Sequence, residues 1–195
     1  KKIISLNTLL SLFFVFVTIP FAVSQMGDIA IFTEQVSWTD VATANAAAQK
    51  IQNELKITKN VEILGDNAIG NFAEEKTGDG KLDIIITFGW FPTSLYPAGN
   101  AKEDGSIGEL FLEDGNMFIN TADYIFYVSN PNNGDTGLKN MTDSTFDMWT
   151  DGTTTKPTEE GEKYTPSVVS FGAGRCFRGD QIDANEEWEI EAAFG

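Results

Sequence analysis

The sequence predicts an α/β protein, a three-layer sandwich with helices on both sides of a mostly parallel sheet. Two observations lead to this fold class. Residues 82–86 form a nearly continuous apolar run, which is typical of a strand buried on both faces in the middle of a parallel sheet. Around this run, short apolar segments alternate with amphipathic ones, as in β-α-β units with right-handed crossovers.

The first half of the chain supplies one such unit. Residues 29–32 and 61–64 are short apolar segments that we expect to be strands. Between them, apolar residues recur every three or four positions over residues 40–55, which indicates an amphipathic helix lying on the sheet. Ser37 and Thr39 are the expected N-cap candidates for this helix.

Further elements surround the central strand. Residues 65–80 form a looser segment with room for one helical turn. Ser106 is placed to cap a helix over residues 107–113, which ends at an Asp-Gly pair. Residues 116–121 are the fourth strand candidate. This order of elements predicts a flavodoxin-like architecture.

The chain becomes more polar after residue 129. Turn-forming residues predict a loop over 130–135, and a short helix is expected within 138–150. Residues 150–166 lack periodicity and are expected to lie on the surface. A late strand is expected over 167–171.

Residues 1–24 have the pattern of a secretory signal peptide. Two lysines precede an apolar run that ends in a small-x-small cleavage pattern at Ser24. The run is interrupted by a threonine and a proline and is short for a membrane span. We therefore expect a secreted or periplasmic protein without stable membrane insertion after cleavage. Residues 25–195 are expected to form a single α/β domain.

Charge and residue usage exclude several classes of function. The chain has 13 basic and 29 acidic residues, a net charge of −16, which disfavours binding to nucleic acid or anionic lipid. It has no histidine and one cysteine. These counts exclude Ser-His-Asp and Cys-His catalysis, histidine-containing zinc sites and an internal disulfide within this chain.

Candidate binding residues follow the predicted strands. Ligands of open α/β sheets bind beyond the carboxyl ends of the strands. The residues predicted there are Glu34, Trp90, Tyr96, Thr121 and Asp123. The aromatic side chains would either stack on a sugar ring or pack beneath their own loop. Acidic residues at loop starts, such as Asp104, are candidates for a general acid and base pair.

Residues 75–83 match part of a calcium-binding loop of the EF-hand type. The bidentate carboxylate required at position 12 is replaced by Ile86, and the residues that follow indicate a strand. We therefore predict an Asp-Gly turn at this place and no metal site. No cofactor and no catalytic residue is predicted.

Residues 82–89 and 109–120, the central strand and the helix-turn-strand after it, resemble the class I glutamine-amidotransferase-like superfamily, particularly its trehalose-utilisation-protein-like branch. The resemblance spans roughly residues 28–128 and implies an α/β architecture. Classical members use a cysteine on a strand-to-helix elbow with a histidine and an acid. This chain has no cysteine near Gly89 or Asn120, so the resemblance implies no glutaminase activity. Members of the branch continue further, so we expect a chain truncated at its C-terminus.

The sequence thus predicts an exported module without catalytic activity, with a binding or accessory role. A carbohydrate or a partner protein domain is the expected ligand. Two alternatives stay open. Paired carboxylates, Glu34 with Asp123, would make the protein a hydrolase. A structural module of a larger secreted protein would instead contact a partner domain through its acidic face, and a large exposed apolar patch without a pocket would favour that alternative.

Overall fold

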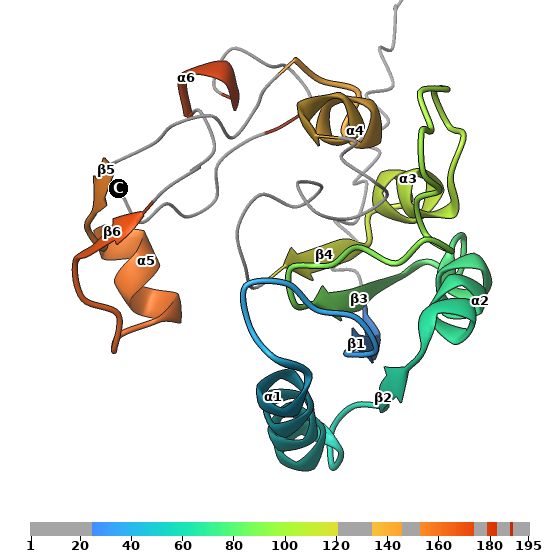
Figure 1. Ribbon diagram of the computed structural model, residues 1–195. Helices are drawn as coiled ribbons and strands as arrows, with labels where there is room; N and C mark the ends of the chain where they lie inside the picture. The colour runs from blue at the N-terminus through green and yellow to red at the C-terminus, as the bar shows by residue number, and fades with distance from the viewer. Residues whose placement is uncertain (1–24, 121–133, 146–152, 174–178, 183–187, 189–195) are drawn as a thin grey trace, which may run out of the picture.

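A computed structural model describes residues 25–120, 134–145, 153–173, 179–182 and 188. Its centre is a four-stranded, all-parallel sheet with the strand order β2-β1-β3-β4 (Figure 1). The strands are β1 (Gln25–Phe32), β2 (Val61–Leu64), β3 (Lys81–Thr87) and β4 (Met117–Asn120). Helices cover both faces of this sheet, which confirms the predicted three-layer α/β sandwich of flavodoxin-like type.

Strand β3 lies inside the sheet, as its apolar run predicts. Residues 83–87 are all buried. Because side chains alternate along a strand, Ile85 packs into the core on one face, and Ile84 and Ile86 pack into the core on the other. The two cores together explain why this segment has no polar alternation.

Helix α1 (Val41–Leu55) covers one face of the sheet. Its buried residues Ala44 and Ala48 pack with the apolar side chains of β1 and β3. The N-cap is Asp40, whose carboxylate accepts the backbone N–H of Thr43 at 2.9 Å. The prediction that Ser37 or Thr39 caps this helix was therefore wrong, because the chain enters the helix one residue later.

Helix α2 (Asp66–Lys76) lies on the opposite face and replaces the loose segment that was predicted for residues 65–80. Its apolar side is short and contains Gly70, which weakens the helical pattern in the sequence. Gly70 is required by packing, since a Cβ there would lie 2.7 Å from the Cβ of Ser94. Tertiary contact, rather than propensity, makes this segment helical.

Two further helices share that face. Helix α3 (Ile107–Glu113) begins at the predicted cap, where the hydroxyl of Ser106 accepts the N–H of Glu109 at 3.2 Å. Helix α4 (Gly134–Met141) inserts Leu138 and Met141 into the same core. The short helix expected within 138–150 thus begins earlier and ends at Met141, and residues 146–150 lie outside the described part of the chain.

The later described residues form small elements. Strands β5 (Thr153–Thr155) and β6 (Phe171–Ala173) pair antiparallel, and α5 (Glu159–Tyr164) lies between them in the chain. A short helix, α6 (Gly179–Ile182), follows. The surface segment expected over 150–166 therefore contains regular structure, and the late strand lies at 171–173 rather than 167–171.

The predicted signal peptide, residues 1–24, lies outside the described residues, and so does most of the loop predicted over 130–135. The extent of the single domain, 25–195, stays a prediction. Among the helices that the structure does describe, none has the length and apolar character needed to cross a membrane.

Candidate functional site

The carboxyl edge of the sheet is closed at the point where the strand order reverses. This point lies between β1 and β3, and ligands of such folds bind in the crevice there. Here the two loops are joined, since the backbone N–H of Ser37 donates to the carbonyl of Phe88 at 2.9 Å. On the other side, the side-chain oxygen of Asn120 accepts the N–H of Gly89 at 2.9 Å. Hydrogen bonds within the chain therefore join the loop after β1 to the loop after β3, and the loop after β3 to the end of β4.

Glu34, a predicted binding residue, has a structural contact at this edge. Its carboxylate accepts the backbone N–H of Asp66 at 2.8 Å, at the start of α2. A carboxylate is favourable there because the first N–H groups of a helix lack partners within the helix. Thr121 and Asp123, also predicted, lie outside the described residues, so the pairing of Glu34 with Asp123 stays a prediction.

The aromatic loop after β3 is packed beneath itself. Phe91 and Tyr96 are fully buried, and Trp90 packs against the same core. The Tyr96 hydroxyl donates to the carbonyl of Asn100 at 3.0 Å. Tyr96 is thus not open to a ligand. Of the two arrangements predicted for the aromatic residues, stacking on a sugar ring or packing beneath their own loop, Tyr96 adopts the second. The Nε1 of Trp90 is buried and has no hydrogen-bond partner among the described residues.

Asp66 fastens this loop to α2. Its carboxylate accepts the backbone N–H of Ser94 at 2.8 Å and the hydroxyl of Thr93 at 2.6 Å. Partial burial opposes ionisation, yet these hydrogen bonds prevail and lower the pKa of Asp66. The loop is therefore held rigidly against the scaffold.

A buried polar network joins α3 to α4. The carboxylate of Glu109, which is only 1% exposed, accepts the side-chain N–H groups of Asn100 at 3.0 Å and Asn140 at 2.6 Å. Asn140 also donates to the Tyr96 hydroxyl at 3.0 Å. Burial raises the pKa of Glu109, and its hydrogen bonds moderate the increase. This network fixes the position of α4, and with it the outer surface between the two helices.

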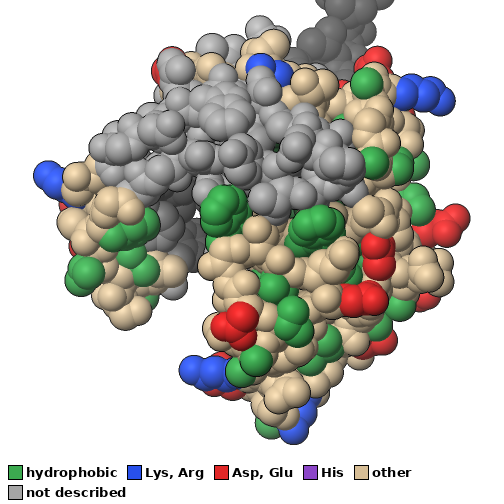
Figure 2. Space-filling model, in the orientation of Figure 1, with side chains coloured by type: hydrophobic (Ala, Val, Ile, Leu, Met, Phe, Trp, Pro, Cys, Tyr) green, Lys and Arg blue, Asp and Glu red, His purple; other side chains and the backbone are tan. Residues whose placement is uncertain are grey.

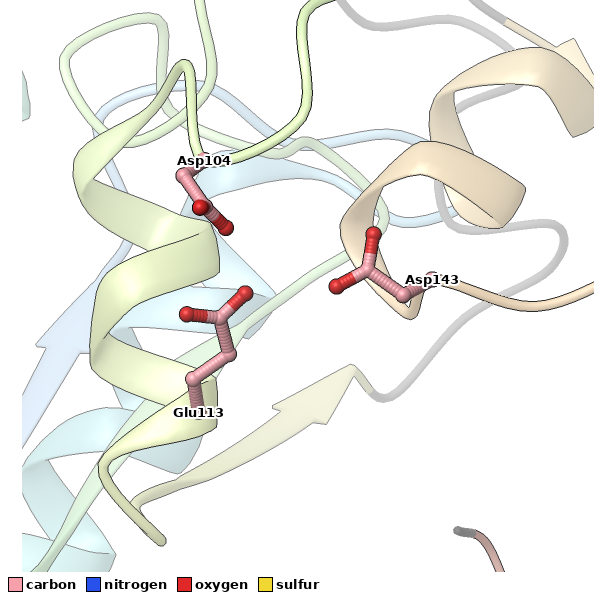
Figure 3. A group of neighbouring side chains, drawn as sticks. All are labelled: Asp104, Glu113 and Asp143. Atoms are coloured by element: carbon pink, nitrogen blue, oxygen red, sulfur yellow. The ribbon is translucent and has the colours of Figure 1, made fainter. Parts of the chain in front are cut away.

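Three carboxylates converge on that outer surface. Asp104 comes from the loop before α3, Glu113 from the end of α3, and Asp143 from the turn after α4, and all three point toward one another (Figure 3). One oxygen of each lies within 4.8 Å of the others. Asp104 and Asp143 have positive φ angles of 54° and 46°, a conformation that Asp tolerates better than most residues.

The proximity of these carboxylates changes their proton affinity. Partial removal from water, together with the neighbouring carboxylates of Asp104 and Asp143, raises the pKa of Glu113 to about 7. Within the described residues, this is the group of acidic side chains that could supply three oxygen ligands to a hard cation. All three are exposed, and exposed acidic groups often gather without an ion, so we assign no metal to them. Protonation of Glu113 lowers the electrostatic repulsion among the three carboxylates without an ion.

Two hollows flank the carboxylates and meet at Asp143. The first has a volume of about 310 Å³ and is lined by Leu112, Glu113, Met141, Thr142, Asp143 and Trp188. The second has a volume of about 490 Å³ and is lined by Ala101, Glu103, Thr136, Lys139, Asn140 and Asp143. The indole N–H of Trp188 donates to the carbonyl of Thr142 at 2.9 Å, which orients the ring at the wall. The surface thus combines an aromatic side chain with carboxylates, an amide and a lysine.

Sequence reasoning found only part of this arrangement. Asp104 is an expected acidic loop residue, but Glu113 and Asp143 belong to separate elements, and no spacing in the sequence links them. Trp188 follows a polar segment and gave no signal of a site. The positive φ angles at Asp104 and Asp143 have no sequence signature either, because Asp adopts many loop conformations.

Comparison with protein-family models, curated proteins and solved structures finds no match for this chain. The resemblance to the class I glutamine-amidotransferase-like superfamily therefore stays a prediction.

Proposed function

We propose that the chain is an exported, non-catalytic binding module that takes a carbohydrate in the two hollows between α3 and α4. The observation that carries this proposal is the indole of Trp188 at the wall of a hollow that also holds Glu113 and Asp143. Sugar rings present an apolar face that stacks on aromatic side chains, and their hydroxyl groups donate hydrogen bonds to carboxylates.

The size and rigidity of the hollows support the same ligand class. Their volumes, about 310 Å³ and 490 Å³, fall within the range of small-ligand sites. The buried contact between Glu109 and Asn140 fixes α4 before any ligand arrives, which lowers the entropy cost of binding. Export, which the N-terminal pattern predicts, would bring the module to extracellular glycans.

The test is a screen of neutral and charged oligosaccharides by isothermal titration calorimetry on residues 25–195. We expect Trp188→Ala to weaken the binding of any glycan that the screen finds by tenfold or more. Trp38→Ala is the matched control, because Trp38 is exposed on a different loop and should leave glycan affinity unchanged. Equal affinity of the Trp188→Ala variant and the parent would contradict the proposal.

A hydrolase acting through paired carboxylates is the second candidate. The elevated pKa of Glu113, about 7, favours it, because a carboxyl group that is half protonated near neutral pH can act as a general acid. Glycosidases that retain configuration hold their two carboxyl groups about 5 Å apart. The pair would then be Glu113 with Asp104 or Asp143, rather than Glu34 with Asp123.

The same glycans distinguish the two candidates. A binding module leaves them intact, whereas a hydrolase releases reducing ends, and Glu113→Gln would stop that release while preserving affinity. Reducing ends released by the parent at a rate that falls as the pH rises through 7 would replace the first proposal by the second.

A further inference from the structure

A third space in the molecule, beside the start of β4, is apolar. Its volume is about 330 Å³, and apolar residues make up most of its described lining. We call this space the apolar pocket. Strands β3 and β4, helices α3 and α4 and one later aromatic residue supply its walls, with Leu82, Leu112, Phe118, Leu138, Met141 and Trp188. Because the walls come from five parts of the chain, the pocket is a product of the tertiary fold.

The polar side chains in this lining already have hydrogen-bond partners within the chain. The side-chain oxygen of Asn116 accepts the N–H of Asp83 at 2.8 Å. The hydroxyl of Thr142 donates to the carbonyl of Leu138 at 2.8 Å, and the indole N–H of Trp188 donates to the carbonyl of Thr142. A group that enters the pocket therefore gains mainly from leaving water, which favours a hydrocarbon group over a polar one.

The volume of the apolar pocket indicates the size of that group. An apolar cavity of about 150 Å³ binds one benzene ring, so a pocket of about twice that volume has room for roughly ten carbon atoms. Water fills such a space poorly, because a buried water needs several polar partners. Met141 in the wall is flexible and can adapt to the shape of a chain.

The apolar pocket adjoins the first of the two hollows described above. Four residues line both spaces, Leu112, Met141, Thr142 and Trp188. On the side of the hollow, the lining adds the carboxylates of Glu113 and Asp143. An apolar space and a polar space thus meet at the indole of Trp188, and one molecule with a polar head and an apolar tail can place a part in each.

Negative charge at this junction selects the head group. Glu113 and Asp143 lie in the adjoining hollow, and Asp104 points toward both (Figure 3). Figure 2 shows further acidic side chains along the side of the molecule that carries α2 and α3. An anionic head, such as the carboxylate of a fatty acid, would be repelled here. The hydroxyl groups of a sugar would instead donate hydrogen bonds to the carboxylates.

We propose that the carbohydrate ligand carries a hydrocarbon chain, as glycolipids and alkyl glycosides do, and that this chain occupies the apolar pocket. The sugar would lie in the adjoining hollow against Trp188. This inference rests on the proposed function for the sugar part of the ligand. The chain part depends only on the apolar pocket, so the two parts can be tested separately.

The experiment is a calorimetric titration of the protein with methyl, butyl, hexyl and octyl β-glucoside, each below the concentration at which it forms micelles. We expect the affinity to rise about two- to fourfold for each methylene added between butyl and octyl, because each one leaves water. The head group is tested with 1-octanol, octanoate and octylammonium. Octyl glucoside should bind at least tenfold more tightly than any of these three.

Two surface variants provide a matched pair. Met117 belongs to the lining of the apolar pocket and is 41% exposed, whereas Leu110 is 43% exposed on α3 and is not part of the described lining. Met117→Glu should weaken the binding of octyl glucoside at least tenfold, because it places a charge beside the chain. Leu110→Glu adds the same charge and should leave that affinity unchanged.

The outcomes separate the chain from the sugar. Affinities of the parent protein that do not change with chain length would overturn the inference, and this series does not depend on the folding of any variant. The proposed function would survive that result if unsubstituted glycans bind. Affinities that rise with chain length, together with 1-octanol or octylammonium binding as tightly as octyl glucoside, would overturn the sugar part and the proposed function with it.

Discussion

Asp83 is a carboxylate that the fold has buried in the middle of its sheet. It is fully buried in β3, and one oxygen accepts the N–H of Asp28, where β1 forms a bulge. The other oxygen, Oδ2, has no hydrogen-bond partner among the described residues. Gly27 is required opposite, because a Cβ there would lie 2.3 Å from the carboxylate. Burial raises the pKa of Asp83, since the charged form loses its hydration.

Replacing this carboxylate should make the protein more stable at neutral pH. A carboxyl group whose pKa is raised on folding stabilises the fold below its ordinary value of 3.8, and that contribution is lost as the pH rises through the raised pKa. Asp83→Asn keeps an oxygen for Asp28 and removes the buried charge. We expect its free energy of unfolding at pH 7 to exceed that of the parent by about 1 kcal/mol.

Urea denaturation across a pH series is the measurement for Asp83→Asn, and the advantage of the variant should shrink as the pH falls toward 3.8. Glu54→Gln, on the exposed side of α1, is the control. A deficit of the variant that grows as the pH rises would show instead that the charged form of Asp83 is favoured in the folded state.

At the scale of helices and strands, the sequence predicted most of the sheet and failed where packing overrides pattern. The four strands and the helix over 41–55 follow from the apolar pattern, and the helix over 107–113 follows from its predicted cap. Helix α2 does not, because its buried side is short and holds a glycine. The convergence of Asp104, Glu113 and Asp143 could not be predicted from the sequence either. The three residues belong to elements that are separated along the chain and come together only when α4 docks.

The packing of α2 can be tested at its glycine. By helix propensity alone, Gly70→Ala would stabilise α2 by about 1 kcal/mol. The structure predicts the opposite, a loss of about 1–3 kcal/mol, because the new methyl group would lie 2.7 Å from the Cβ of Ser94. Thermal unfolding gives the sign. The double variant with Ser94→Gly should recover part of the loss, and a Gly70→Ala variant more stable than the parent would mean that α2 and the aromatic loop lie further apart.

At the scale of the whole molecule, negative charge limits stability at neutral pH. The net charge of −16 opposes compaction through self-repulsion. Three carboxyl groups, Asp83, Glu109 and Glu113, have pKa values raised in the folded state, so protonation favours folding for each of them.

We therefore expect the melting temperature to rise as the pH falls from about 7 toward 4.5. Over this interval Glu113 is protonated in the folded state but still ionised in the unfolded state. At neutral pH, added salt should also raise it, because salt screens the repulsion between exposed charges. Differential scanning calorimetry over pH and salt checks both effects. Glu113→Gln should show a smaller gain on acidification, and a melting temperature that falls over this interval would refute the expectation.

The hydrogen bonds of the Asn140 side chain determine whether glycosylation can still occur after α4 has docked. Asn140-Met141-Thr142 is an acceptor sequence for N-linked glycans, yet the amide nitrogen that would carry the sugar already donates to Glu109 and Tyr96. Once α4 has docked, a glycosylating enzyme cannot reach this nitrogen without breaking both contacts. In a host that attaches such glycans, modification at Asn140 would therefore mark molecules in which the enzyme reached Asn140 before α4 docked. The modified fraction would measure the rate of docking relative to the rate of glycosylation.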